Sequence, residues 1–196
     1  AGAQGHDPDK MAAGGGSIPA GWSARLDNGS NKAEGVRFMT MGTGVHFMTG
    51  PAGIYWQPAM TKSGTYTVSA TFNQMEASAH PEAYGLFIGG TDLNGAGQKY
   101  TYFLVRQDGQ YLIKRRQGAN TPTIADWTPS PAVKKTDATT KGSNTLSIAV
   151  AGDTVKFSIN GTEVKSVPAS QADASGLIGL RINHNLNVHV EGFGVK

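Results

Sequence analysis

The side chains best suited to bind a ligand in the last third of the chain are Arg181, Asn183 and His184. Arg181 and Asn183 alternate with apolar residues, and this period of two places both side chains on one face of a predicted strand, with His184 at its end. A guanidinium, an amide and an imidazole offer hydrogen bonds to hydroxyl or carboxylate groups. His46 and His189 lie on other predicted strands, and we expect them to join the same surface.

A second set combines aromatic rings with a cation. Tyr102 and Arg106 share one face of a predicted strand over 100–106, where they could clamp a sugar or a carboxylate. An arginine that merely lies over a tyrosine on a solvated sheet explains the same pattern equally well. Only one residue of the neighbouring pair Tyr55 and Trp56 can face the core, and we predict that Tyr55 is the exposed one.

The carboxylates that could act as acid or base are Glu82, Asp92 and Glu191. Glycoside hydrolysis with retention needs two carboxyl groups about 5–5.5 Å apart. Glu82 and Asp92 bracket one predicted strand, so at about 3.3 Å per residue they are too far apart unless their loops fold back. The simpler interpretation is that these residues form turns and surface charges.

Two metal sites can be considered. Asp92 and Asn94 belong to an Asp-Leu-Asn-Gly segment that is a fragment of a calcium loop, but the bidentate glutamate of a full EF-type loop is missing. Calcium held by these side chains and main-chain carbonyls is one interpretation, and a plain turn is the other. A histidine pair with an acid such as Glu191 would be a second ligand set, but His184 and His189 lack the close spacing typical of metal ligands. Apart from calcium, no cofactor is expected.

Short strands must position these residues, and the clearest ones lie between 144 and 196. Apolar residues alternate there with small or polar ones over 146–150 and 155–159, which indicates half-buried strands. The Gly152-Asp153 and Asn160-Gly161 pairs stand where tight reversals are needed, and Asp108-Gly109 marks another hairpin. The expected strands are 22–27, 36–41, 45–49, 53–56, 65–74, 83–89, 100–106 and 111–116, followed by those of the closing region.

Two segments depart from this pattern. Residues 119–142 contain Pro122, Pro129 and Pro131, and we predict a long connection across one end of the fold. The best helical candidate is a short turn around 170–174. Residues 1–17 are rich in Gly and Ala and are predicted to be a flexible leader or linker, which leaves 18–196 as a single domain.

The composition of the chain excludes several classes of protein. The chain has 196 residues and 27 glycines, only 16% charged residues and no cysteine, so it has no disulfides and no thiolate chemistry. A net charge of +3 is spread too widely to indicate a nucleic-acid surface. No apolar run approaches the roughly 20 residues that span a bilayer. We expect an exported bacterial protein.

Several of these segments resemble the jelly rolls of the concanavalin A-like lectin/glucanase superfamily. LSIAVAGDTVKFSINGTEV resembles a strand-turn-strand-turn-strand unit of that superfamily, and YGLFIGG with YTYFLVRQDGQYLIKRR resembles its paired central strands. SGLIGLRI with VHVEGFGV is similar to the closing strands. Within the superfamily, the chain looks most like laminin-G-like domains and bacterial secreted domains of the 3-keto-disaccharide hydrolase type.

The resemblance implies an all-β, two-sheet antiparallel jelly-roll sandwich whose concave face meets sugar. The Glu-x-Asp-x-x-Glu run of the glucanase branch is absent, so its mechanism is not transferred. Three functions stay open: an exported module that binds a polysaccharide or oligosaccharide, a glycoside hydrolase using the carboxylates above, and a structural or cell-surface interaction module. The first is our prediction, with a site made of Tyr55, Tyr102, Arg106, Arg181, Asn183 and His184.

Overall fold

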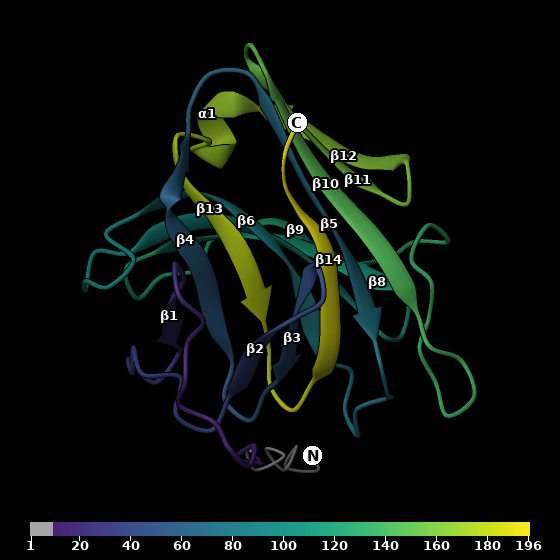
Figure 1. The fold of residues 1–196 in the computed structure, drawn as a ribbon. Helices are drawn as coiled ribbons and strands as arrows, with labels where there is room; N and C mark the ends of the chain where they lie inside the picture. Colours follow the sequence, from purple (N-terminus) through teal and green to yellow (C-terminus); the bar gives the residue numbers. More distant parts are fainter. Residues whose placement is uncertain (1–9) are drawn as a thin grey trace, which may run out of the picture.

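Two seven-stranded antiparallel sheets stack face to face in the computed structural model, which describes residues 10–196 (Figure 1). Sheet A has the order β1-β4-β13-β6-β7-β8-β9, and sheet B has the order β12-β11-β10-β5-β14-β3-β2. In Figure 1, β4 and β13 run lengthwise, whereas β6 and the strands beyond it pass crosswise behind sheet B. The predicted all-β jelly-roll sandwich is confirmed.

The chain alternates repeatedly between the two sheets. Sheet A comprises β1 (Ser23–Leu26), β4 (Gly53–Lys62), β13 (Gly176–Ile182), β6 (Ala83–Thr91), β7 (Lys99–Arg106), β8 (Gln110–Gln117) and β9 (Thr123–Pro129). Sheet B comprises β12 (Thr162–Pro168), β11 (Thr154–Ile159), β10 (Ser143–Ala151), β5 (Tyr66–Gln74), β14 (Asn187–Val195), β3 (Gly44–Met48) and β2 (Arg37–Met41). The short helix α1 (Ala169–Ala172) lies where the helical turn was expected.

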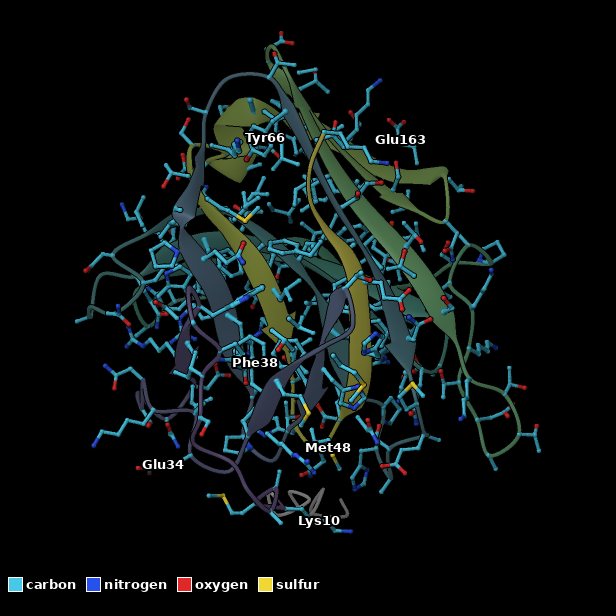
Figure 2. The ribbon with its side chains drawn as sticks, in the orientation of Figure 1. Lys10, Glu34, Phe38, Met48, Tyr66 and Glu163 are labelled. Carbon is cyan, nitrogen blue, oxygen red and sulfur yellow. The ribbon has the colours of Figure 1, made fainter. Side chains whose placement is uncertain are left out.

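The core lies between the sheets and follows the alternation of the sequence. In β5 and β10 every second residue is buried, including Val68, Phe72 and Ile148, while the residues between them are half-exposed. Phe38 of β2 enters the same core (Figure 2). Tyr66 closes the core at the end near α1, where its hydroxyl donates a hydrogen bond to the Ala174 carbonyl.

The hairpins form where glycine and asparagine permit positive φ. Gly152, Asn160 and Gly161 have φ values of 62°, 50° and 83°, and they connect β10, β11 and β12 as predicted. Gly109, with φ of 88°, turns β7 into β8. Residues other than glycine and asparagine rarely adopt a positive φ, so these residues fix the position of each turn and thereby the register of the meander.

One predicted connection is wrong in part, because β9 lies within 119–142. Its pairing with β8 shifts register twice, between Tyr111 and Ile113 and again between Ile113 and Lys114. These irregularities break the alternation of period two, and the strand also forms the edge of sheet A. The sequence therefore showed no strand pattern here.

The predicted leader falls partly outside the described residues, which begin at Lys10. From there to residue 17 the chain lies against the domain: the Ala12 amide donates to the Gly35 carbonyl, and the Gly16 amide donates to the Val36 carbonyl. Residues 10–196 contain one helix of four residues, α1. No helix in this part of the chain is long and apolar enough to cross a membrane.

Candidate functional site

The outer face of sheet A, which points away from the core, is the most distinctive surface of the molecule. It bears a second apolar group, here called the outer-face cluster: Ile54, Trp56, Ala83, Phe87, Leu93, Tyr100, Tyr102, Leu104 and Leu112. β6 is buried at eight of its nine positions, which shows that both of its faces are covered. Gly179 makes this possible, since a Cβ there would collide with the Phe87 ring.

A bidentate ion pair stands at the centre of this face. Arg181 of β13 donates from Nη1 and Nη2 to the two carboxylate oxygens of Asp27, at 3.0 and 2.7 Å, and its Nη1 lies 3.3 Å from the Tyr100 hydroxyl. The Arg181 guanidinium also lies 5.4 Å from the centre of the Tyr102 ring. Arg181 is only 8% exposed, so it is packed into the face and not merely laid upon it.

The charges of this pair stabilise each other. Burial alone would raise the pKa of Asp27, but the Arg181 guanidinium outweighs it, with smaller contributions from Arg116 and His184, and the pKa falls below its ordinary value. For Tyr102, burial raises the pKa more than the nearby arginines lower it. At neutral pH the face therefore holds an ionised Asp27 carboxylate, a charged Arg181 guanidinium and a neutral Tyr102 phenol.

A more accessible part of the face lies toward β9. The Arg106 guanidinium stacks over the Trp127 ring, 4.1 Å from its centre, and Arg106 Nε donates to Asp108 Oδ1 at 2.8 Å. Lys114 and Arg116 are the cross-strand partners of Tyr102 and Tyr100, and they bring two more cations to the face. Arg106, Lys114, Arg116 and Trp127 are each partly exposed, unlike the tyrosines.

The loop after β6 covers one edge of this face. Arg25 Nη1 donates to the carbonyls of Leu93 and Gly95, at 2.8 and 2.6 Å, and Leu93 packs into the outer-face cluster. Asp92 Oδ2 accepts a hydrogen bond from the Gly97 amide at 3.1 Å. The Asp92 carboxylate is thus used to fold the loop that also contains Asn94.

The structure brings together Tyr102, Arg106 and Arg181 from the predicted site, and it corrects Tyr55. Tyr55 is 0% exposed and packs in the core against Phe38 and Phe47, whereas Trp56 points to the outer face. The prediction that the two side chains point to opposite faces is confirmed, but the prediction that Tyr55 is the exposed one is wrong. Both faces of β4 are apolar, so the sequence does not distinguish them. Tyr102 is 7% exposed, so it forms the floor beneath Arg181.

Asn183 and His184 follow β13. The Asn183 amide donates to the Ala83 carbonyl, and its side-chain Oδ1 is buried without a hydrogen-bond partner. His184 lies near enough to Asp27 to lower the pKa of that carboxyl. Their roles in ligand binding stay predictions.

His46 and His189 do not join this surface, contrary to our expectation. They lie on β3 and β14 and face outward from sheet B, on the opposite side of the sandwich. Their strands pair with each other and with β5, and none of these belongs to sheet A. Alternation placed each histidine opposite the apolar residues of its own strand, but it could not show which sheet that strand would enter.

The three candidate carboxylates lie apart. Glu82 and Asp92 stand at or beyond opposite ends of β6, and Glu191 lies on β14 in the other sheet. The nine residues of β6 span about 30 Å at 3.3 Å per residue. Among residues 10–196, no group of three or more His, Cys, Asp or Glu side chains is arranged to hold a metal ion.

Two residues of the site escaped the sequence analysis. Asp27 gave no signal because its partner Arg181 is 154 positions away. Trp127 lies on β9, a strand that the sequence pattern did not predict. The spacing of Tyr102 and Arg106 and the alternation of Arg181 with its apolar neighbours were the local signals that pointed to this face.

Comparison with known proteins agrees with this architecture. No family model matches the chain, and no curated protein matches it either. Among solved structures, the carbohydrate binding module CBM66 from Bacillus subtilis aligns with a TM-score of 0.65 at 11% identity, over 90% of this chain and 95% of that one. The carbohydrate recognition domain of Emp46p, in its metal-free form, aligns with a TM-score of 0.61 at 11% identity, over 96% and 94%.

A third structure, a Bacillus subtilis protein of unknown function described as having a galectin-like fold, gives a TM-score of 0.59 at 15% identity over 89% of this chain and 88% of that one. At such low identities the likeness concerns the fold alone. Nearly the whole chain takes part in each alignment. The chain therefore has the concanavalin A-like jelly-roll fold.

Proposed function

We propose that this protein is a carbohydrate-binding module that holds a glycan across the outer face of sheet A. The observation that carries the proposal is the half-buried Trp127 ring beside Arg106, with Lys114 and Arg116 further along the same face as the partners of Tyr102 and Tyr100. Ligand sites combine apolar surface with a few placed polar groups, and an aromatic ring offers a flat apolar face for the C–H groups of a sugar. The outer-face cluster gives these groups a rigid base.

The comparisons support this proposal at the level of architecture. Two of the structural neighbours are a carbohydrate binding module and a carbohydrate recognition domain. Sheet A of this chain also has the polar and aromatic outer face that such a role requires. Sheet B, by contrast, presents small side chains along β10, namely Thr145, Ser147 and Ala149.

The charges on the face favour an acidic sugar. Arg181 is paired with Asp27, and Arg106 with Asp108. Within residues 10–196, no ion pair joins Lys114 or Arg116 to a carboxylate, so these two cations keep their charge for a ligand. We therefore expect glycans that contain uronic acids to bind better than neutral glycans, and added salt to weaken their binding.

A glycan array probed with the purified chain tests the proposal, followed by calorimetric titration of each hit at low and high salt. Trp127→Ala and Arg106→Ala should each reduce affinity about tenfold, which corresponds to about 1.4 kcal/mol. Lys165→Ala removes an exposed cation from β12 in sheet B and serves as the matched control, with unchanged affinity expected.

Mass spectrometry of the recovered glycan separates binding from cleavage. An intact glycan together with the two losses of affinity supports the module. Cleaved products would favour the hydrolase instead. Equal affinity of the Trp127 and Lys165 variants would show that the glycan binds elsewhere, and an array without any hit would contradict the proposal.

Export is a further part of the proposal. The low charged fraction of 16% and the absence of cysteine are both compatible with a protein that folds outside the cytoplasm without disulfides. Fractionation of the source cells, with detection by antibody, is the test. Recovery in the cytoplasmic fraction alone would contradict it.

A further inference from the structure

A histidine pair on the outer face of sheet B has an arrangement that the glycan site does not use. His46 of β3 and His189 of β14 are direct cross-strand partners, and their Nδ1 atoms lie 3.4 Å apart. The ring centres are 5.5 Å apart and the ring planes differ by 35°. Gly44 leaves room for the His189 ring, since a Cβ there would lie within 3.1 Å of His189 Nε2.

The opposite nitrogen of each ring is already engaged. His46 Nε2 lies 2.7 Å from Asn187 Oδ1, and His189 Nε2 lies 3.3 Å from Glu191 Oε1. The Asn187 oxygen only accepts hydrogen bonds, so the proton of neutral His46 is on Nε2, and the nearby Glu191 carboxylate favours the same tautomer of His189.

Both Nδ1 atoms then carry lone pairs directed at the space between the rings. Two unprotonated Nδ1 atoms 3.4 Å apart repel each other unless a proton or a metal ion lies between them. At the roughly 2.0–2.1 Å of a metal–imidazole bond, two nitrogens in a tetrahedral arrangement lie about 3.4 Å apart. Metal-binding histidines also typically donate their other N–H to a carboxylate or carbonyl oxygen: His46 donates to Asn187 in this way, and the Glu191 carboxylate lies 3.3 Å from the corresponding nitrogen of His189.

The surroundings of the pair are rich in thioethers. Met41 and Met75 line the same pocket of about 540 Å³ as both histidines. Met39 of β2 is the cross-strand partner of His46. Met48 lies at the end of β3, the strand of His46, and faces outward (Figure 2). Four of the six methionines of the chain therefore lie around two of its histidines.

This ligand chemistry selects a soft ion of low charge. Thioether sulfur and imidazole favour copper(I), whereas calcium and magnesium prefer oxygen. Glu191 is the acid that lines the pocket, while Lys141 lines it as well and Arg37 acts on His46 from β2. Two nearby cations against one carboxylate disfavour a doubly charged ion more than a singly charged one.

We propose that His46 and His189 bind one copper(I) ion through their Nδ1 atoms, with the thioethers of Met41 and Met75 as further ligands. Asn187 and Glu191 hold the rings in the tautomer that binds. The site lies on the opposite side of the sandwich from the proposed glycan site, and neither proposal depends on the other.

Copper(I) titration under anaerobic reducing conditions, in competition with a chromogenic copper(I) chelator, tests the site in the full chain. One equivalent should bind. Asn187→Ala should weaken binding about 10–100-fold, as expected when a ligand loses its orienting partner. His46→Ala and His189→Ala should each weaken it further. The matched controls His80→Ala and Met11→Leu, which alter a histidine and a methionine outside the pocket, should leave it unchanged.

Two measurements keep the proposal open to refutation if a histidine variant folds poorly. Circular dichroism and melting temperature identify such a variant, and X-ray absorption at the copper edge of the unaltered protein reports the ligands directly. Nitrogen and sulfur neighbours together support the site. A spectrum without sulfur, tighter binding of zinc(II) than of copper(I), or equal copper affinity of the His46 and His80 variants would each overturn it.

Discussion

The outer faces of sheets A and B use polar residues in different ways. On sheet A, Arg181 is 8% exposed and is fixed by Asp27 and the tyrosines beneath it, so its charge is part of the packing. On sheet B, His46 and His189 lie above a core that is already complete, since Phe47 and Val188 beside them are 0% exposed and face inward. The buried Arg181 of sheet A therefore supports the fold, whereas the histidine pair of sheet B lies outside the core and is available to a ligand.

The burial patterns of the strands differ between the two sheets in the same way. β5 and β10 alternate between buried and half-exposed residues, as sheets with one wet face do. β6 and most of β7 are buried on both faces, although no third layer of strands covers sheet A within residues 10–196. The apolar and aromatic side chains on the outer face of sheet A form a rigid, well-packed surface. Such a surface is a candidate for ligand binding.

The largest expected effect comes from removing the buried cation of sheet A. Arg181→Met leaves the Asp27 carboxylate without its partner. Breaking a fully buried pair costs about 3–5 kcal/mol, and because the Asp27 side chain is 38% exposed we expect a smaller loss in the free energy of unfolding, about 1–3 kcal/mol. Urea denaturation at neutral pH measures it.

Arg106→Met is the control for this experiment. Arg106 lies on the same face with its side chain 21% exposed, and its pair with Asp108 is open to solvent, so we expect a loss below about 1 kcal/mol. Equal losses for the two arginine variants would show that Arg181 is not part of the packing and would remove the contrast between the faces.

A smaller effect is expected from acid. The pKa of Asp27 is lowered in the folded protein from its ordinary value of 3.8, so the pair stabilises the fold fully above that value. This contribution should be lost as the pH falls from about 4 through the lower folded pKa, because protonation of Asp27 removes its attraction to Arg181. Thermal melts between pH 6 and pH 2 measure the change.

Asp27→Asn shows whether this acid response belongs to the pair. The variant should be less stable at neutral pH, and the gap between it and the original protein should narrow as the pH falls. A constant gap over the whole range would mean that Asp27 titrates alike in the folded and unfolded chains, and hence that Arg181 does not hold its charge.

The smallest effect is expected on sheet B. His46→Ala should change the free energy of unfolding of the metal-free protein by about 0.5 kcal/mol or less, because the side chain lies on an outer face. Phe47→Ala, one residue along and pointing into the core, should cost about 3–5 kcal/mol. Chemical denaturation of both variants checks this. A large loss for His46→Ala would show that the histidine pair is structural.

The sequence by itself determined the class of fold, most strands and the tight turns. Those features depend on neighbours along the chain: a period of two buries Val68 and Phe72, and Gly109 or Asn160 permits a reversal. It also placed Tyr102 and Arg106 on one face, since two residues four positions apart on a regular strand point to the same side. It failed at β9, where bulges remove the period.

Only the tertiary structure decided which strands become neighbours. Asp27 meets Arg181 across 154 positions, and His46 meets His189 across 143, because sheet order is set by packing the whole chain. The same packing decided that Tyr55 faces the core and Trp56 the outer surface, a choice that two apolar residues cannot express locally. Local periodicity fixes which side chains share a face, but the long-range pairing of strands decides what that face becomes.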